Sequence, residues 1–101
     1  MNAPKFDPTR LDLAREYRAR PMGRHSPELQ ALLDVMRHPD NHGNLILVSV
    51  APGRWVLGQR QPNSAPPVLF EDEVFERIED GEWAAFKRRW HTLTGQALAI
   101  P

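Results

Sequence analysis

The sequence of 101 residues predicts an α+β domain: a small antiparallel sheet of two or three strands packed with a capped N-terminal helix and two C-terminal helices. Three observations indicate this class. A serine-proline pair precedes a helical apolar stripe at residues 26–36, a turn joins two apolar runs at about 45–60, and aromatic residues recur at helical spacing near the C-terminus.

Residues 1–25 form an arginine-rich segment in which Asp7-Pro8 is typical of a helix start. Leu11, Ala14 and Tyr17 would line one side of that helix. The stripe is narrow, so a short helix and a tail ordered by a partner fit equally well. We therefore expect three parts: the arginine-rich segment 1–25, a single α+β domain over 26–95, and a tail over 96–101.

Ser26-Pro27-Glu28 predicts the start of the next helix, with serine as cap, proline in the first turn and glutamate at the positive end of the helix dipole. His38-Pro39 should end it, because a residue before proline is pushed away from helical geometry. The apolar residues between these limits recur at i, i+3, i+4 and i+7: Leu29, Leu32, Leu33 and Met36.

Residues 45–50 read as a strand that is apolar on both faces, which favours a central position in the sheet. Ala51-Pro52-Gly53-Arg54 has the composition of a turn, and residues 55–60 then return as the second strand of a hairpin. Residues 68–70 are short enough for an edge strand. A proline-containing loop, 61–67, separates them from the hairpin.

Two helices are expected after this strand. Glu71-Asp72-Glu73 resembles an acidic first turn, and Asp80-Gly81 should break the helix that follows it. The last helix would then carry a buried seam and stop at Gly95. The seam consists of Trp83, Phe86, Trp90 and Leu93.

Composition excludes several classes of site. The chain contains no cysteine, so disulfides and cysteine-ligated metals are ruled out. The longest apolar run, Leu45–Val48, is far shorter than the roughly 20 residues of a membrane span. The first residues carry no apolar signal core, and we expect a cytoplasmic protein without a membrane partner.

The histidines and serines suggest a metal site or a nucleophile with its base, but their local sequence supports neither kind of site. His38, Asp40 and His42 have ligand side chains, but Pro39 prevents both histidines from sharing one helix face. We therefore expect solvated loop histidines and no metal. His25-Ser26 resembles a base beside a nucleophile, yet Ser26 is better used as a cap. We expect no cofactor and no catalytic residue.

Seven carboxylates near the C-terminus could form a catalytic pair, a cation site or an acidic docking surface. A solvated acidic face explains them most simply, because they fall on expected helix starts and outer faces. They are Glu71, Asp72, Glu73, Glu76, Glu79, Asp80 and Glu82.

Five arginines lie within residues 10–24, and such an arm can bind phosphates. Asp12 and Glu16 dilute this charge, the net charge is zero and the isoelectric point is about 6.9, which argues against nucleic acid. An acidic partner protein fits better, because arginine is enriched at interfaces. Trp55 is either core or an interface anchor. The expected partner-binding residues are Arg15, Arg18, Arg20, Met22, Arg24, His25 and Trp55.

The order of sequence blocks from Arg20 to Trp90, about 70 of the 101 residues, resembles the small (alpha) subunit family of N,N-dimethylformamidase. The blocks are Pro21–Gln30 entering a helix, Met36–Pro39 ending it, Arg54–Leu57 after a turn, and Leu69–Trp90 running from acidic residues to Phe86-Lys87-Arg88-Arg89-Trp90.

The resemblance implies a non-catalytic accessory subunit. In that family the large subunit carries the catalytic iron and hydrolyses the amide, while the small subunit packs against it. A larger protein subunit is therefore the expected partner. The alternative is a free-standing or homodimeric protein-interaction module.

Overall fold

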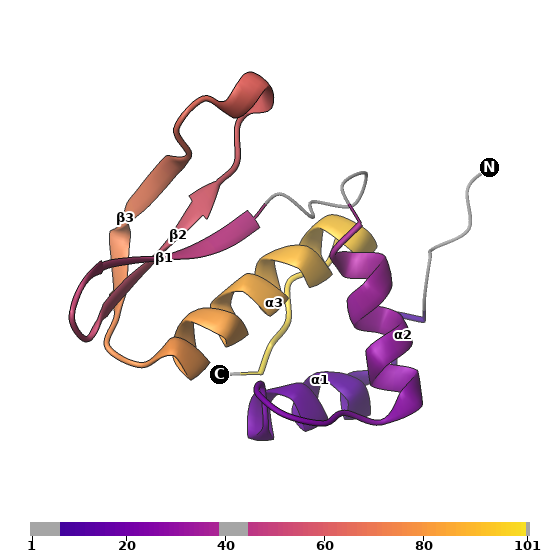
Figure 1. The fold of residues 1–101 in the computed structure, drawn as a ribbon. Coiled ribbons are helices and arrows are strands. Elements are labelled where there is room, and N and C mark those ends of the chain that lie inside the picture. Colours follow the sequence, from indigo (N-terminus) through magenta and orange to yellow (C-terminus); the bar gives the residue numbers. More distant parts are fainter. Residues whose placement is uncertain (1–6, 39–44, 101) are drawn as a thin grey trace.

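The computed structural model describes residues 7–38 and 45–100 and confirms an α+β arrangement (Figure 1). Three helices and a three-stranded antiparallel sheet make up the described chain, with one short 3-10 turn, η2. In order they are α1 (Leu11–Ala19), α2 (Pro27–Met36), β1 (Leu45–Ala51), β2 (Arg54–Gln59), η2 (Pro62–Ser64), β3 (Val68–Phe75) and α3 (Ile78–Thr94).

The sheet has the order β1-β2-β3, so the expectation of a central first strand is wrong and β2 lies in the middle. The predicted hairpin is present, with Leu47 opposite Leu57. Along β3 the register slips: Trp55 of β2 faces Phe75 and Leu57 faces Phe70. Between these two pairs β2 advances by two residues, from Trp55 to Leu57, whereas β3 uses five, from Phe70 to Phe75. Strand β3 therefore bulges between the two pairs.

The acidic run Glu71–Glu73 lies inside strand β3, so the expected helix start there is wrong, and one C-terminal helix follows instead of two. Gly81 does not break α3. A Cβ atom at Gly81 would lie 2.5 Å from Cδ2 of Leu47, which shows that the glycine permits close approach of α3 to β1.

One side of α3 builds the main core against α1 and α2. Its predicted aromatic seam is buried there, with Phe86 at the centre: ring centroids lie 4.6 Å from Tyr17, 5.4 Å from Trp83 and 6.0 Å from Trp90. Leu29, Leu32, Leu33 and Met36 of α2 are buried in the same cluster, as their spacing predicts.

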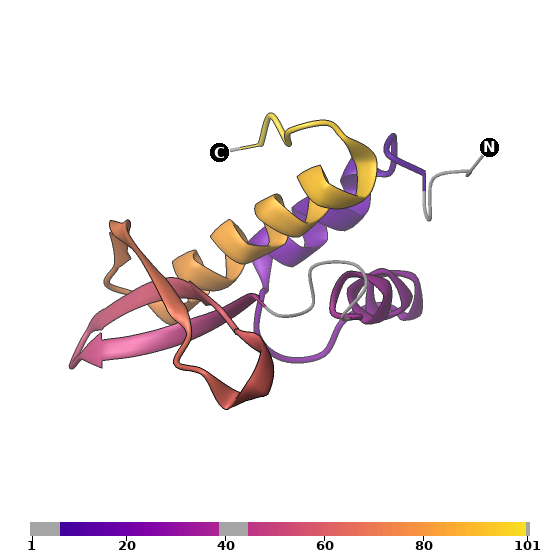
Figure 2. The same ribbon diagram turned by 90° about the horizontal axis from the view of Figure 1, so that it is seen from above.

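The opposite side of α3 packs on the sheet with small residues. Ala84 and Ala85 contact Leu45 of β1 and Leu57 of β2, and Phe70 and Phe75 of β3 lie at the border of this second cluster. Both ribbon views place all three helices on one side of the sheet (Figures 1 and 2). Because α3 carries aromatic residues on one side and small residues on the other, it packs against α1 and α2 with one side and against the sheet with the other.

Helix α1 begins at Leu11, later than the Asp7-Pro8 signal predicts. The Asp7 carboxylate instead accepts hydrogen bonds from the Thr9 N–H at 2.8 Å and the Thr9 hydroxyl at 2.7 Å, closing a turn before the helix. The burial of α1 also differs in part from the expected stripe: Ala14 and Tyr17 are fully buried, whereas Leu11 is exposed.

Phe86 should be the most sensitive core position, because it touches three other aromatic rings. Replacement by alanine is expected to lower the free energy of unfolding by about 3–5 kcal/mol, measured by urea denaturation. The exposed Thr92 on the same helix is the control, and Thr92→Ala should change stability by less than about 0.7 kcal/mol. Equal effects of the two changes would contradict the assigned core.

Candidate functional site

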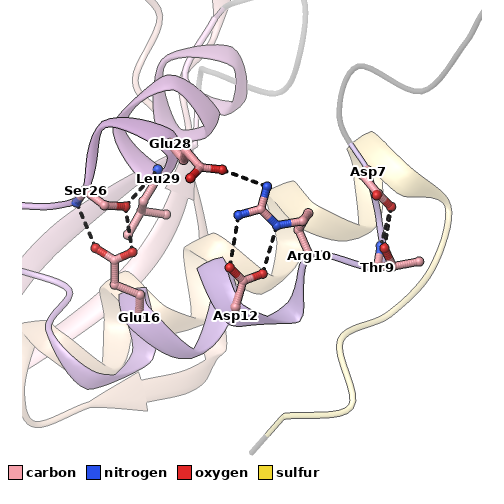
Figure 3. Close-up of polar contacts among 8 residues, drawn as sticks. All are labelled: Asp7, Thr9, Arg10, Asp12, Glu16, Ser26, Glu28 and Leu29. Atoms are coloured by element: carbon pink, nitrogen blue, oxygen red, sulfur yellow. Dashed lines mark hydrogen bonds and ion pairs between the residues drawn. The ribbon is translucent and has the colours of Figure 1, made fainter.

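The segment between α1 and α2, residues 20–26, is fixed at its end by a pair of hydrogen bonds from Ser26 to Glu16 (Figure 3). The Ser26 N–H donates to one carboxylate oxygen at 2.8 Å, and the Ser26 hydroxyl donates to the other at 2.7 Å. These bonds hold the pKa of Glu16 below its ordinary value. The same hydroxyl accepts from the Leu29 N–H at 3.2 Å, so Ser26 is the predicted helix cap.

An arginine also joins the two helices. Arg10 lies 3.0 Å from the Asp12 carboxylate and 2.8 Å from that of Glu28, on the exposed side of the α1–α2 junction (Figure 3). The hydrogen bond to Arg10 keeps the pKa of Asp12 low. Arg10 therefore serves the packing of α1 on α2, and its exposure makes each pair individually weak.

His25 has a structural contact within this segment. Its Nε2 atom lies 2.9 Å from the Arg20 carbonyl oxygen, and its ring lies 5.5 Å from that of Tyr17. This half-buried histidine, predicted as a partner contact, thus closes the loop on itself. The loop is held from inside by this contact and by burial of Pro21, whereas Arg20, Met22 and Arg24 are exposed.

A shallow groove of about 340 Å³ lies between this loop and the start of α3. One wall is the end of α1 and the loop, with Arg18, Arg20 and Met22. The other wall contains Arg77, the residue before α3, and acidic residues of the first turn. The residues that line the groove are Arg18, Ala19, Arg20, Pro21, Met22, Arg77, Glu79 and Asp80.

Arg18 is engaged across this groove. Its guanidinium lies 3.8 Å from the Asp80 carboxylate and 5.7 Å from the ring centre of Trp83, which Lys87 also approaches at 5.7 Å. A cation above an aromatic face is attracted to it. Arg18 therefore covers the core aromatic residue and ties α1 to α3.

Three other predicted arginines point away from such contacts. The side chains of Arg15, Arg20 and Arg24 are exposed and make no ion pair within residues 7–38 and 45–100. Met22 lies between them in sequence with 48% of its surface exposed, although methionine is usually buried. The end of α1 and the loop thus carry exposed guanidinium groups that form no ion pair among the described residues, and one of them, Arg20, lines the groove together with Met22.

Trp55 lies apart from this loop, on β2, where it is half-buried opposite Ser49 and Phe75. Phe75 is two residues before Arg77, which lines the groove, so Trp55 belongs to the same end of the sheet as the start of α3. The structure brings Arg18, Arg20 and Met22 together and leaves Trp55 beyond them.

The other candidate chemistry gains no geometric support. Asp40 and His42 lie outside the described residues, and His38 is exposed after α2. Within the described part of the chain, no three histidine or acidic side chains gather as a metal site would require. The same residues contain no helix long and apolar enough to cross a membrane.

Two polar side chains lie in the interior: Arg89, whose burial the sequence did not predict, and Tyr17, which was expected on the apolar side of its helix. Arg89 donates from Nη2 to the Leu45 carbonyl oxygen at 2.9 Å, and burial lowers its pKa, helped by the positive charge of Arg37. The hydroxyl of buried Tyr17 donates to Glu82 at 3.3 Å, and burial raises its pKa to about 12. With this pKa, the Tyr17 hydroxyl is not poised to exchange protons near neutral pH.

The sequence did not predict the contacts of Glu16 and Asp80 or the place of Arg77 in the groove, although Asp80 was among the seven carboxylates considered. The Ser-Pro-Glu cap was visible, but no local pattern shows that Glu16, ten residues earlier, receives both Ser26 donors. Asp80 faces Arg18 only because the fold brings α1 to α3.

The fold and these contacts define a small α+β protein in which Glu16, Ser26 and Arg18 hold loops and helices in place. A family model described as the N,N-dimethylformamidase alpha subunit matches residues 7–99. The chain therefore belongs to the N,N-dimethylformamidase alpha subunit family, as the resemblance implies. No curated protein matches the chain.

Ser26→Ala removes both the cap to Leu29 and the hydroxyl bond to Glu16. We expect a loss of about 1–2 kcal/mol in the free energy of unfolding, measured by thermal or urea denaturation. Ser26→Thr, which keeps a hydroxyl cap, should recover most of the loss. A stability for Ser26→Ala equal to that of the parent would contradict the role of the cap.

The low pKa of Glu16 predicts a pH dependence of stability. A carboxyl whose folded pKa is depressed stabilises fully above its unfolded pKa and loses this contribution as pH falls through the folded value. The stability difference between the parent and Glu16→Gln should therefore be largest above about pH 5 and shrink toward about pH 3.

The control for this experiment is the same substitution in a Ser26→Ala background. Its pH dependence should be weaker, because one of the two hydrogen bonds to Glu16 is already gone. A Glu16→Gln difference that stays constant across the pH range would refute the assignment.

Proposed function

We propose that this chain is a non-catalytic accessory subunit that packs against a larger protein subunit in the cytoplasm. Its membership of the alpha subunit family supports a place in a complex. The observation that carries the docking site is the exposed loop, where Arg20 and Arg24, which form no ion pair in the described part of the chain, flank Met22 in sequence.

The backbone of this surface is set before binding. Ser26 is bonded to Glu16 and His25 to the Arg20 carbonyl, so little loop entropy remains to be lost on association. A preset loop with an apolar residue between arginines suits a partner that offers a shallow apolar pocket rimmed by carboxylates.

The remaining predicted contacts fit around this centre. Arg15 lies on α1, one turn before the loop, and is exposed, while Arg18 lines the groove. His25 contributes indirectly, because its hydrogen-bond contact with the Arg20 carbonyl oxygen holds the loop. Trp55, near the start of α3, would be a secondary anchor at the border of the interface.

A non-catalytic role is consistent with how the polar side chains are used. The carboxylate of Glu16 and the hydroxyl of Ser26 are bonded to each other, and Arg18 covers Trp83. Amide hydrolysis would then reside in the larger subunit. Turnover of N,N-dimethylformamide by the isolated small chain would contradict this proposal.

Arg20→Glu and Met22→Ala should each weaken binding to the larger subunit at least roughly tenfold, measured by calorimetry on purified components. Arg60→Glu is the matched control, an exposed arginine beyond β2, and should leave affinity within about twofold. Thermal unfolding of each isolated variant should match the parent. Equal loss of affinity in all three variants, or in none, would argue against this docking surface.

A further inference from the structure

The two edges of the sheet differ in their protection against pairing with another chain. At the β3 edge, Glu71, Asp72 and Glu73 are exposed, the strand bulges, and Pro66-Pro67 precedes it. Charge, bulging and proline are the means by which proteins prevent edge strands from recruiting new strands. The β3 edge is therefore closed to pairing.

The β1 edge, Leu45–Ala51, carries neither charge nor proline, and its register irregularity is confined to the position between Ser49 and Ala51. Within the described residues, no backbone hydrogen bond reaches β1 from outside the hairpin. Such a strand is a template for another strand.

A hydrogen bond from α3 indicates which backbone groups of β1 face outward. The Leu45 carbonyl oxygen accepts from Arg89. Because alternate residues of an edge strand direct their N–H and C=O groups away from the sheet, the same direction recurs at Leu47 and Ser49. These two residues present the pairing groups.

We propose that β1 pairs antiparallel with β1 of a second copy of this chain, with Val48 on the two-fold axis. Leu47 then faces Ser49 of the other copy, so the outward backbone groups meet each other. Ile46 faces Val50, a pairing of β-branched side chains favoured across strands. Two three-stranded sheets become one six-stranded sheet.

A second copy fits this edge because the strand complements itself. Pairing β1 with β1 places no like charges opposite each other, and it puts the acidic β3 strands at the two far ends of the sheet. Val50, with 45% of its surface exposed, gains an aliphatic neighbour. The net charge of zero adds no long-range repulsion.

The test is the oligomeric state of the isolated chain, measured by sedimentation over a concentration series. We expect a concentration-dependent dimer, weak because a pairing this short falls below the usual interface size of about 1,200 Å². Val50→Lys should weaken dimerisation at least roughly tenfold, since lysine blocks edge pairing. Val74→Lys is the matched control: Val74 is 48% exposed on β3, and its replacement should leave the dimer intact.

Amide hydrogen exchange separates strand pairing from other contacts. The Leu47 and Ser49 amides should become protected as concentration rises. A chain that stays monomeric, a dimer equally weakened by both lysines, or amides protected only when the larger subunit is added would overturn the proposal. This result is independent of binding to the larger subunit, so either proposal can fail alone.

Discussion

The architecture depends on the two unlike sides of helix α3. One side carries the aromatic rings that meet α1 and α2, and the other carries Gly81, Ala85 and Arg89 at intervals of four residues. Gly81 admits Leu47 of β1, and Arg89 bonds the carbonyl of Leu45, so the helix is fixed to the first three residues of this strand. Without small residues on the sheet side, the two cores could not share one helix.

Many side chains that could otherwise take part in catalysis or ligand binding instead stabilise this arrangement of helices and sheet. Glu16 receives the donors of Ser26, Tyr17 bonds Glu82 from within the core, and Arg18 covers Trp83. The described residues left exposed and without ion pairs around the α1–α2 loop are arginines beside Met22. This division of labour is what one expects of a chain that contributes shape and a contact surface to a larger assembly.

Features encoded locally could be predicted, and those set by distant contacts could not. The Ser26 cap, the α2 stripe, the hairpin and the aromatic seam follow from neighbouring residues, and the structure confirms them. Gly81 resembled a helix break because nothing nearby reveals Leu47, and Glu71–Glu73 resembled a helix start because an exposed, bulged edge strand lacks apolar alternation. β1 looked central because it is apolar on both faces. The arginine-rich loop could be proposed as a contact from composition, but its partner Glu16 and the facing Asp80 come from the fold.

We propose that the loop between α1 and α2 is the surface by which this chain meets a larger subunit. Hydrogen–deuterium exchange of the small chain, alone and in the reconstituted complex, tests it most directly. New protection in the complex should concentrate at residues 15–25 and at the start of α3. Protection confined to other elements, or an unchanged pattern in a chain that never forms the complex, would contradict it.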